Sequence, residues 1–69
     1  MNAMATLDHV EVFYVDRNTG WGAALYNIKG HQISNAIFAY HKSQVMEWAA
    51  KEWPGETVKE FTKAGNLKG

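Results

Sequence analysis

Three segments between positions 9 and 40 are rich in apolar residues and are separated by short polar stretches, a pattern typical of consecutive β-strands. Residues 9–15 read His-Val-Glu-Val-Phe-Tyr-Val, and residues 21–28 and 31–40 are also rich in β-branched and aromatic side chains. Residues 16–20 supply the Asp, Asn and Gly that form hairpin loops, and Lys29-Gly30 marks a tight second turn. The pattern predicts three consecutive strands that form an antiparallel meander.

Beyond residue 41 the apolar positions follow the period of an α-helix. The apolar stripe of this helix consists of Val45, Met46, Ala49, Ala50 and Trp53. Ser43 can cap its start, His41 with Gln44 is an alternative cap, and Pro54-Gly55 ends it. Residues 57–62 form a short fourth strand. The predicted fold is α+β, in the order β-β-β-α-β: an antiparallel meander, one helix packed on the sheet, and a short fourth strand.

The three strands of the meander carry apolar side chains on both faces of the sheet. Val10 and Val12 alternate with Phe13 and Val15 along the first strand, and the next two strands alternate in the same way. One helix covers only one face, and a large exposed apolar patch tends to mark an interaction site. We therefore expect a non-enzymatic protein-interaction module that is homodimeric through an apolar sheet face, since two-fold dimers are the commonest assembly. A host or cognate protein is the alternative partner.

The candidate partner-binding residues are the aromatic side chains on or beside this surface. Trp48 lies on the flank of the helical stripe, about 100° from Ala49, where it either covers the sheet edge or anchors a partner. The full candidate set is Trp48, Tyr26, Phe38, Tyr40 and Phe13.

An aromatic sheet face can also stack unpaired bases, as it does in proteins that bind single-stranded nucleic acid. In this alternative Tyr26, Phe38 and Tyr40 form the stacking platform. The basic residues that would contact the nucleic-acid backbone are Arg17, Lys29, Lys63 and Lys68. The chain has seven basic and seven acidic residues and no net charge, whereas affinity for nucleic acid depends on phosphate neutralisation. The charge balance therefore favours a protein partner.

Length and composition limit the chain to one small domain. Its 69 residues leave little core, so stability is marginal unless a disulfide, a metal or a partner chain supports it. The sequence has no cysteine, which excludes a disulfide and fits the reducing cytoplasm. No apolar run approaches the roughly 20 residues that span a bilayer, so we expect no membrane association. The opening residues resemble an expression-vector scar, so we assign residues 1–3 to a tag remnant and residues 4–69 to the domain.

No catalytic or metal-binding motif is recognisable in the chain. His9, His31 and His41 lack ligand spacing and are interpreted as unrelated surface or capping histidines. No Gly-x-Ser-x-Gly elbow is present, and the Gly-x-Gly at residues 20–22 lacks the third glycine and the following helix of a dinucleotide site. We therefore expect no enzymatic activity, no cofactor and no metal.

The order of these parts resembles a family of small uncharacterised bacterial and phage proteins. The matching features are Val10 and Val12, the Gly-Trp at residues 20–21, the Ala-Ala at residues 49–50, and a Phe-x-Lys-x-Gly-x-Leu closing strand at residues 61–67. Trp48 and Trp53 on the helix depart from this pattern, because smaller residues are usual there. The layout is also similar to that of HicB-like antitoxins, the partners of HicA-type RNA-cleaving toxins, without their DNA-binding tail. The first resemblance implies the β-β-β-α-β fold and no reaction, and the second implies a toxin-antitoxin component.

Overall fold

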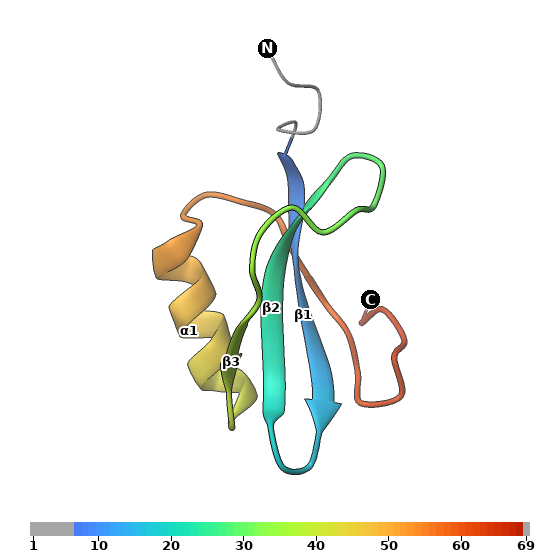
Figure 1. Cartoon of the computed structure of the whole chain (residues 1–69), viewed down its shortest axis with the longest axis vertical. Coiled ribbons are helices and arrows are strands. Elements are labelled where there is room, and N and C mark those ends of the chain that lie inside the picture. Colours follow the sequence, from blue (N-terminus) through green and yellow to red (C-terminus); the bar gives the residue numbers. More distant parts are fainter. Residues whose placement is uncertain (1–6, 69) are drawn as a thin grey trace.

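Four strands and one helix make up the part of the chain that the computed structural model describes, residues 7–68. In chain order they are β1 (Leu7–Asp16), β2 (Gly20–Asn27), β3 (Ile37–Ala39), α1 (Lys42–Glu52) and β4 (Val58–Glu60) (Figure 1). The predicted α+β fold and its β-β-β-α-β order are confirmed. The proposed tag remnant and the start of the domain at residue 4 lie outside the described residues.

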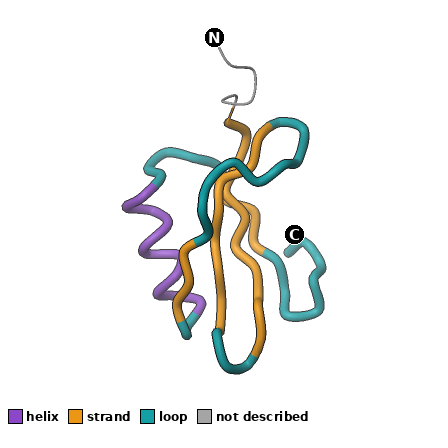
Figure 2. The backbone as a smooth tube through the Cα atoms, in the orientation of Figure 1, coloured by secondary structure: helices purple, strands orange, loops and turns teal. Residues whose placement is uncertain are grey.

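The sheet has the strand order β3-β2-β1-β4. The first three strands form the predicted antiparallel meander, whereas β4 pairs in parallel with β1, so the sheet is mixed. Because β3 runs antiparallel to β2 and β4 runs parallel to β1, β3 and β4 point the same way. Parallel strands need a long crossover connection, which here consists of α1 and the loop that follows it; α1 stays on the β3 side of the sheet, and the loop crosses to β4 (Figure 2).

The hairpin between β1 and β2 is closed by a side chain. The Asp16 Oδ1 atom accepts the backbone N–H of Asn18 at 3.0 Å and that of Thr19 at 2.6 Å. The Thr19 backbone hydrogen bond is the main reason that the pKa of the Asp16 carboxyl is lowered. Gly20 follows with a φ of 93°, and a Cβ there would collide with the backbone of Tyr40. This position therefore requires glycine for both its conformation and its space.

The core lies between α1 and one face of the sheet. Its buried members are Val10, Val12, Ala23, Leu25, Val45 and Ala49. Trp21, Ile33, Ile37, Ala39, Met46 and Trp53 pack around them. The helical stripe is therefore confirmed at Val45, Met46, Ala49 and Trp53, whereas Ala50 is exposed. The sheet face that carries Val10 and Val12 is therefore the one that the helix covers, and the face that carries Phe13 is left open (Figure 1).

The N-cap of α1 is His41 and not Ser43, which lies inside the helix. His41 has an extended backbone, and its N–H donates to the Gln44 Oε1 atom at 3.3 Å. The alternative cap pair at residues 41 and 44 is therefore the correct one. The helix ends at Trp53, whose N–H bonds to the Ala49 carbonyl, before Pro54. Among residues 7–68 no helix is long and apolar enough to cross a membrane.

The third strand is much shorter than predicted. The sequence pattern gave residues 31–40, but only Ile37–Ala39 pairs with β2, and Gln32 makes one isolated bridge to Tyr26. The reason is the polar segment at residues 34–35. The Ser34 hydroxyl accepts the Leu25 N–H at 3.0 Å, so a side chain takes the place of a ladder carbonyl and the chain leaves the sheet.

The C-terminal segment forms a small hairpin beside β4. Phe61 pairs with Leu67 in an antiparallel bridge, and the Thr62 N–H donates to the Asn66 carbonyl. Residues 63–66 form the turn of this hairpin, and Leu67 lies in its second arm. The hairpin leaves β4 on the side of the molecule opposite α1 (Figure 1).

Candidate functional site

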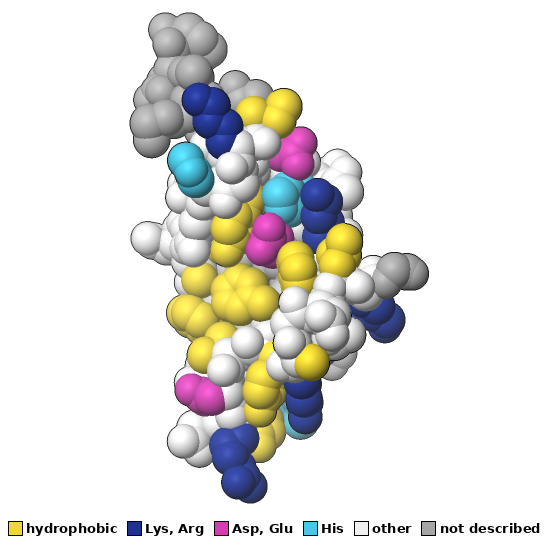
Figure 3. All heavy atoms as spheres, turned by 90° about the vertical axis from the view of Figure 1, so that its right-hand side faces the viewer, with side chains coloured by type: hydrophobic (Ala, Val, Ile, Leu, Met, Phe, Trp, Pro, Cys, Tyr) yellow, Lys and Arg dark blue, Asp and Glu magenta, His cyan; other side chains and the backbone are white. Residues whose placement is uncertain are grey.

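The open face of the sheet has an apolar end built on Gly22. In the strand register Gly22 lies between Phe13 of β1 and Phe38 of β3. A Cβ on Gly22 would lie 2.8 Å from the Phe13 Cε1 atom and 3.1 Å from the Phe38 Cδ1 atom, so the two phenyl rings occupy the space that a side chain would need. We call Phe13 and Phe38 the phenyl pair. Hydrophobic side chains gather in the middle of this face in Figure 3.

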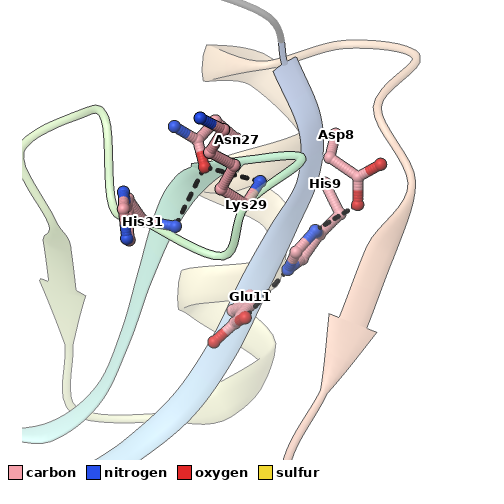
Figure 4. A network of polar contacts seen from close by, with 6 residues as sticks. All are labelled: Asp8, His9, Glu11, Asn27, Lys29 and His31. Atoms are coloured by element: carbon pink, nitrogen blue, oxygen red, sulfur yellow. Dashed lines mark hydrogen bonds and ion pairs between the residues drawn. The ribbon is translucent and has the colours of Figure 1, made fainter. Parts of the chain in front are cut away.

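The other end of the open face is polar and is organised by His9, which is only 5% exposed. Its Nδ1 atom lies 2.7 Å from the Asp8 Oδ2 atom, and its Nε2 atom lies 2.8 Å from the Glu11 Oε2 atom (Figure 4). Carboxylates only accept hydrogen bonds, so both contacts are satisfied when the imidazole donates from both nitrogens. The arrangement joins one imidazole ring to two carboxyl groups and uses both ring nitrogens.

Tyr26 completes this polar end. Its ring stacks on His9 with a centroid distance of 5.6 Å and an interplanar angle of 11°. Burial raises the pKa of the Tyr26 phenol, and the nearby Glu11 carboxylate raises it further. Tyr26 therefore belongs to a closed polar cluster and is separated from the phenyl pair by the Glu11–Ala24 row of the sheet.

The neighbouring turn is held by the buried side chain of Asn27. Its Oδ1 atom accepts the backbone N–H of Lys29 at 2.9 Å and that of His31 at 3.0 Å (Figure 4). The candidate base-stacking residue Tyr26 and the candidate cation Lys29 thus lie near a tight structural turn, away from the other aromatic candidates.

The edge of the sheet at β3 carries exposed aromatic side chains. Phe38 is 49% exposed on the open face, and Trp48 of α1 is 45% exposed, as predicted for a residue on the flank of the stripe. Crossovers between parallel strands are right-handed in nearly all proteins. In a right-handed crossover from β3 to β4, the flank of α1 that carries Trp48 faces the β3 side of the sheet. Phe38 and Trp48 therefore lie at the same edge of the molecule, Phe38 in the sheet layer and Trp48 in the helix layer.

Tyr40 belongs to a different site, an open pocket with a volume of about 550 Å³ at the hairpin end of the helix-covered face. Tyr14, Trp21 and Tyr40 contribute its aromatic walls. Arg17 and Lys63 contribute positive charge. The two candidate cations that the sequence placed on the nucleic-acid path are therefore brought together with one of the candidate aromatic residues.

The other two candidate cations lie elsewhere. Lys29 is in the turn after β2, and Lys68 is at the C-terminal end, where its Nζ atom lies 3.9 Å from the Glu60 Oε1 atom. Glu60 is bound more closely by Lys42 of α1, at 2.8 Å, and this hydrogen bond is the main reason that the pKa of Glu60 is lowered. The four basic residues do not form the single path that the nucleic-acid alternative needs.

Sequence reasoning missed the cluster around His9, which it interpreted as a surface residue. A usable signal was present, because residues two apart in a strand share a face and His9 and Glu11 are two apart. The contact with Asp8 was not predictable in this way. It depends on the register irregularity between Leu7 and His9, which brings consecutive side chains to the same ring. Within residues 7–68 no group of three or more His, Cys, Asp or Glu side chains is placed to hold a metal ion.

The chain matches no protein-family model, and comparison with curated proteins and with solved structures finds no significant similarity. Arguments about function therefore start from the contacts within this chain.

Proposed function

We propose that the protein is a non-enzymatic interaction module that forms a two-fold homodimer through the outer edge of β3. The observation that carries the proposal is an uncharged edge strand, Ile37–Ala39, with the half-exposed Phe38 at its centre. An edge strand presents unpaired N–H and C=O groups that bind a further strand. A second copy of the same chain supplies that strand in our proposal.

The two edges of the sheet differ in their charge and in whether another segment of the chain lies beside them. At β4 the strand itself carries Lys59 and Glu60, and the C-terminal hairpin returns beside it, where the Lys68 N–H donates to the Glu60 carbonyl at 2.8 Å. Residues 33–40, which contain β3, include no charged residue and no proline. Charge, proline and covering segments are the usual means by which proteins block edge pairing. The β3 edge is therefore the one suited to self-association.

Side chains on both layers of this edge support the same partner. In an antiparallel pairing centred on Phe38, the two copies of Phe38 meet on the open face, each with Phe13 beside it. Trp48 from each copy lies on the other layer, next to the partner helix. Aromatic pairs across strands contribute about 0.2–1 kcal/mol each, and buried aromatic side chains dominate interface energies. The dimer has one continuous sheet made from the four strands of each copy.

A dimer also answers the stability problem of so short a chain. A 69-residue domain buries only about 60% of the surface of its unfolded form, and this one has no disulfide. Its fully buried core side chains are no larger than valine. Covering the phenyl pair and Trp48 extends this small core without any change of fold.

The absence of catalysis is part of the proposal. His9 is the buried histidine of the described chain, and both of its ring nitrogens contact carboxylates, so no hydroxyl nucleophile is activated there. The resemblance to bacterial and phage proteins suggests an accessory role in a bacterial cytoplasm. The similarity to HicB-like antitoxins suggests a toxin-antitoxin component, but this second suggestion rests on layout alone, and layout does not determine function.

The proposal predicts that Phe38→Lys converts the dimer into a monomer. Two lysines facing each other across a two-fold axis repel, and the aromatic contact is lost. Size-exclusion chromatography with light scattering should give twice 7.8 kDa for the unchanged chain at tens of micromolar and 7.8 kDa for the variant.

The matched control is Ile28→Lys, because Ile28 is an exposed apolar side chain in the turn after β2. This variant should remain dimeric. A monomeric unchanged chain, or equal dissociation by both substitutions, removes the β3 interface.

A further inference from the structure

The pocket at the hairpin end of the helix-covered face combines aromatic rings with free positive charge. Its wall rings come from three separate strands or their ends: Tyr14 from β1, Trp21 from β2, and Tyr40 from the residue after β3. Four segments of the chain meet there, because the C-terminal turn adds Lys63. The volume of about 550 Å³ lies within the range of sites that hold small organic ligands.

Tyr40 is the ring that is available for stacking. It is 61% exposed, and its contact with His41 is edge-on, at 78° and a centroid distance of 5.1 Å, so neither ring covers the other face to face. Tyr14 and Trp21 are also edge-on to each other, at 68° and 5.3 Å. The pocket therefore has rigid aromatic walls and one ring that a planar ligand can cover.

Two cations line the pocket together with these rings. The Lys63 Nζ atom is 5.1 Å from the centre of the Tyr14 ring, which holds it over the pocket. Arg17 also lines the pocket, and neither cation makes an ion pair with any residue between 7 and 68. Asp16 is the acidic residue of the lining, and its Oδ1 atom is already used by two backbone N–H groups of the turn.

We propose that this pocket binds a nucleoside monophosphate unit, either as a free nucleotide or as one residue of a single-stranded nucleic acid. The base stacks on Tyr40, and Arg17 and Lys63 bind the phosphate. Guanidinium groups bind phosphate through paired hydrogen bonds, and base–aromatic stacking tolerates every base. A simple anion makes no use of the three rings, and a neutral base makes no use of the two cations. The pocket lies at the hairpin end of the sheet, whereas the proposed β3 interface is centred on Phe38.

Calorimetric titration of the full chain tests the assignment with four probes: adenosine monophosphate, adenosine, inorganic phosphate and a short single-stranded oligoadenylate. The monophosphate or the oligonucleotide should bind saturably, and adenosine and phosphate should each bind at least about tenfold more weakly. Stronger binding of the oligonucleotide identifies single-stranded nucleic acid as the source, and equal binding identifies the free nucleotide.

Substitutions locate the binding. Tyr40→Ala and Arg17→Ala should each weaken it about tenfold, because one removes the stacking ring and the other a phosphate ligand. Both side chains are exposed, and unchanged circular dichroism establishes that the variants fold. Lys29→Ala, which removes a cation at the far turn, should bind like the unchanged chain, and so should Phe38→Lys. Absence of saturable binding, phosphate binding as tight as the nucleotide, or an equal loss in Lys29→Ala overturns the assignment.

Discussion

At the scale of single residues, the packing of the open face depends on the absence of a side chain at Gly22. Gly22 has no Cβ, and Phe13 and Phe38 use that space to lie across β2. This is a packing role, since Gly22 is not among the glycines with positive φ. Ala24, the next open-face residue of β2, has no exposed surface.

Gly22→Ala should therefore destabilise the fold, although alanine usually suits a strand better than glycine. Removing glycine gains about 0.4–1 kcal/mol from the unfolded state, whereas overpacking of a filled site costs about 1–3 kcal/mol. The net effect should be a loss of about 1 kcal/mol in denaturant unfolding at fixed protein concentration.

The same substitution in a Phe13→Leu background should cost less, because leucine lacks the Cε1 atom that the new methyl group meets. An additive double variant would show that the phenyl pair does not limit the space at Gly22.

At the scale of elements, α1 is attached to β4 by one charged pair. Lys42 in the first turn of the helix lies 2.8 Å from Glu60, and the same ammonium group lies 5.3 Å from the centre of the Trp21 ring. This contact joins the two ends of the crossover across the sheet. It also positions the helix start beside the pocket that Trp21 lines.

This pair predicts a pH dependence. The pKa of Glu60 is lower in the folded protein than its ordinary value of 4.5, so the unfolded chain binds more protons in this range. The contribution of Glu60 is complete above pH 4.5 and is lost as the pH falls through the lowered folded pKa.

Glu60→Gln should lose about 0.2–1 kcal/mol at neutral pH, the range of surface ion pairs, and should show a flatter decline in acid. Glu47→Gln is the control, because Glu47 is an exposed helical carboxylate with no ion pair among residues 7–68. Parallel acid profiles for Glu60→Gln and the unchanged chain, measured as urea midpoints, would contradict the assigned role.

The elements show which parts of the fold were predictable from sequence. The β-branched and aromatic runs of β1 and β2 and the period-three-to-four stripe of α1 are local signals, and the structure follows their bounds within two residues. The length of β3 was not predictable, because it depends on where the Ser34 hydroxyl meets the Leu25 N–H across the sheet. The parallel pairing of β4 also depends on a distant strand.

Only the parts of the candidate site that depend on local sequence signals could be predicted. Exposure of Trp48 follows from its place on the helix, and the placement of Phe13 and Phe38 on one face follows from strand alternation. The pocket joins Arg17, Tyr40 and Lys63, which are far apart in sequence; the pairing of β3 with β2 brings Tyr40 there, and the pairing of β4 with β1 brings Lys63. The sequence pattern of a single helix or strand does not predict which distant segments meet at the pocket.

At the scale of the whole molecule, the protein has three surfaces with different chemistry. The polar cluster of His9 is closed by its own contacts, the pocket around Tyr40 faces solvent, and the β3 edge exposes Phe38 and Trp48. The central claim is that two β3 strands pair across a two-fold axis.

The most direct measurement is a set of nuclear Overhauser effects between copies, recorded on an equimolar mixture of isotope-labelled and unlabelled chain. The account predicts cross-copy contacts from Ile37–Ala39 and between the two Phe38 rings. Cross-copy contacts confined to Tyr26 or to the C-terminal hairpin, or no cross-copy contacts at millimolar concentration, would contradict it.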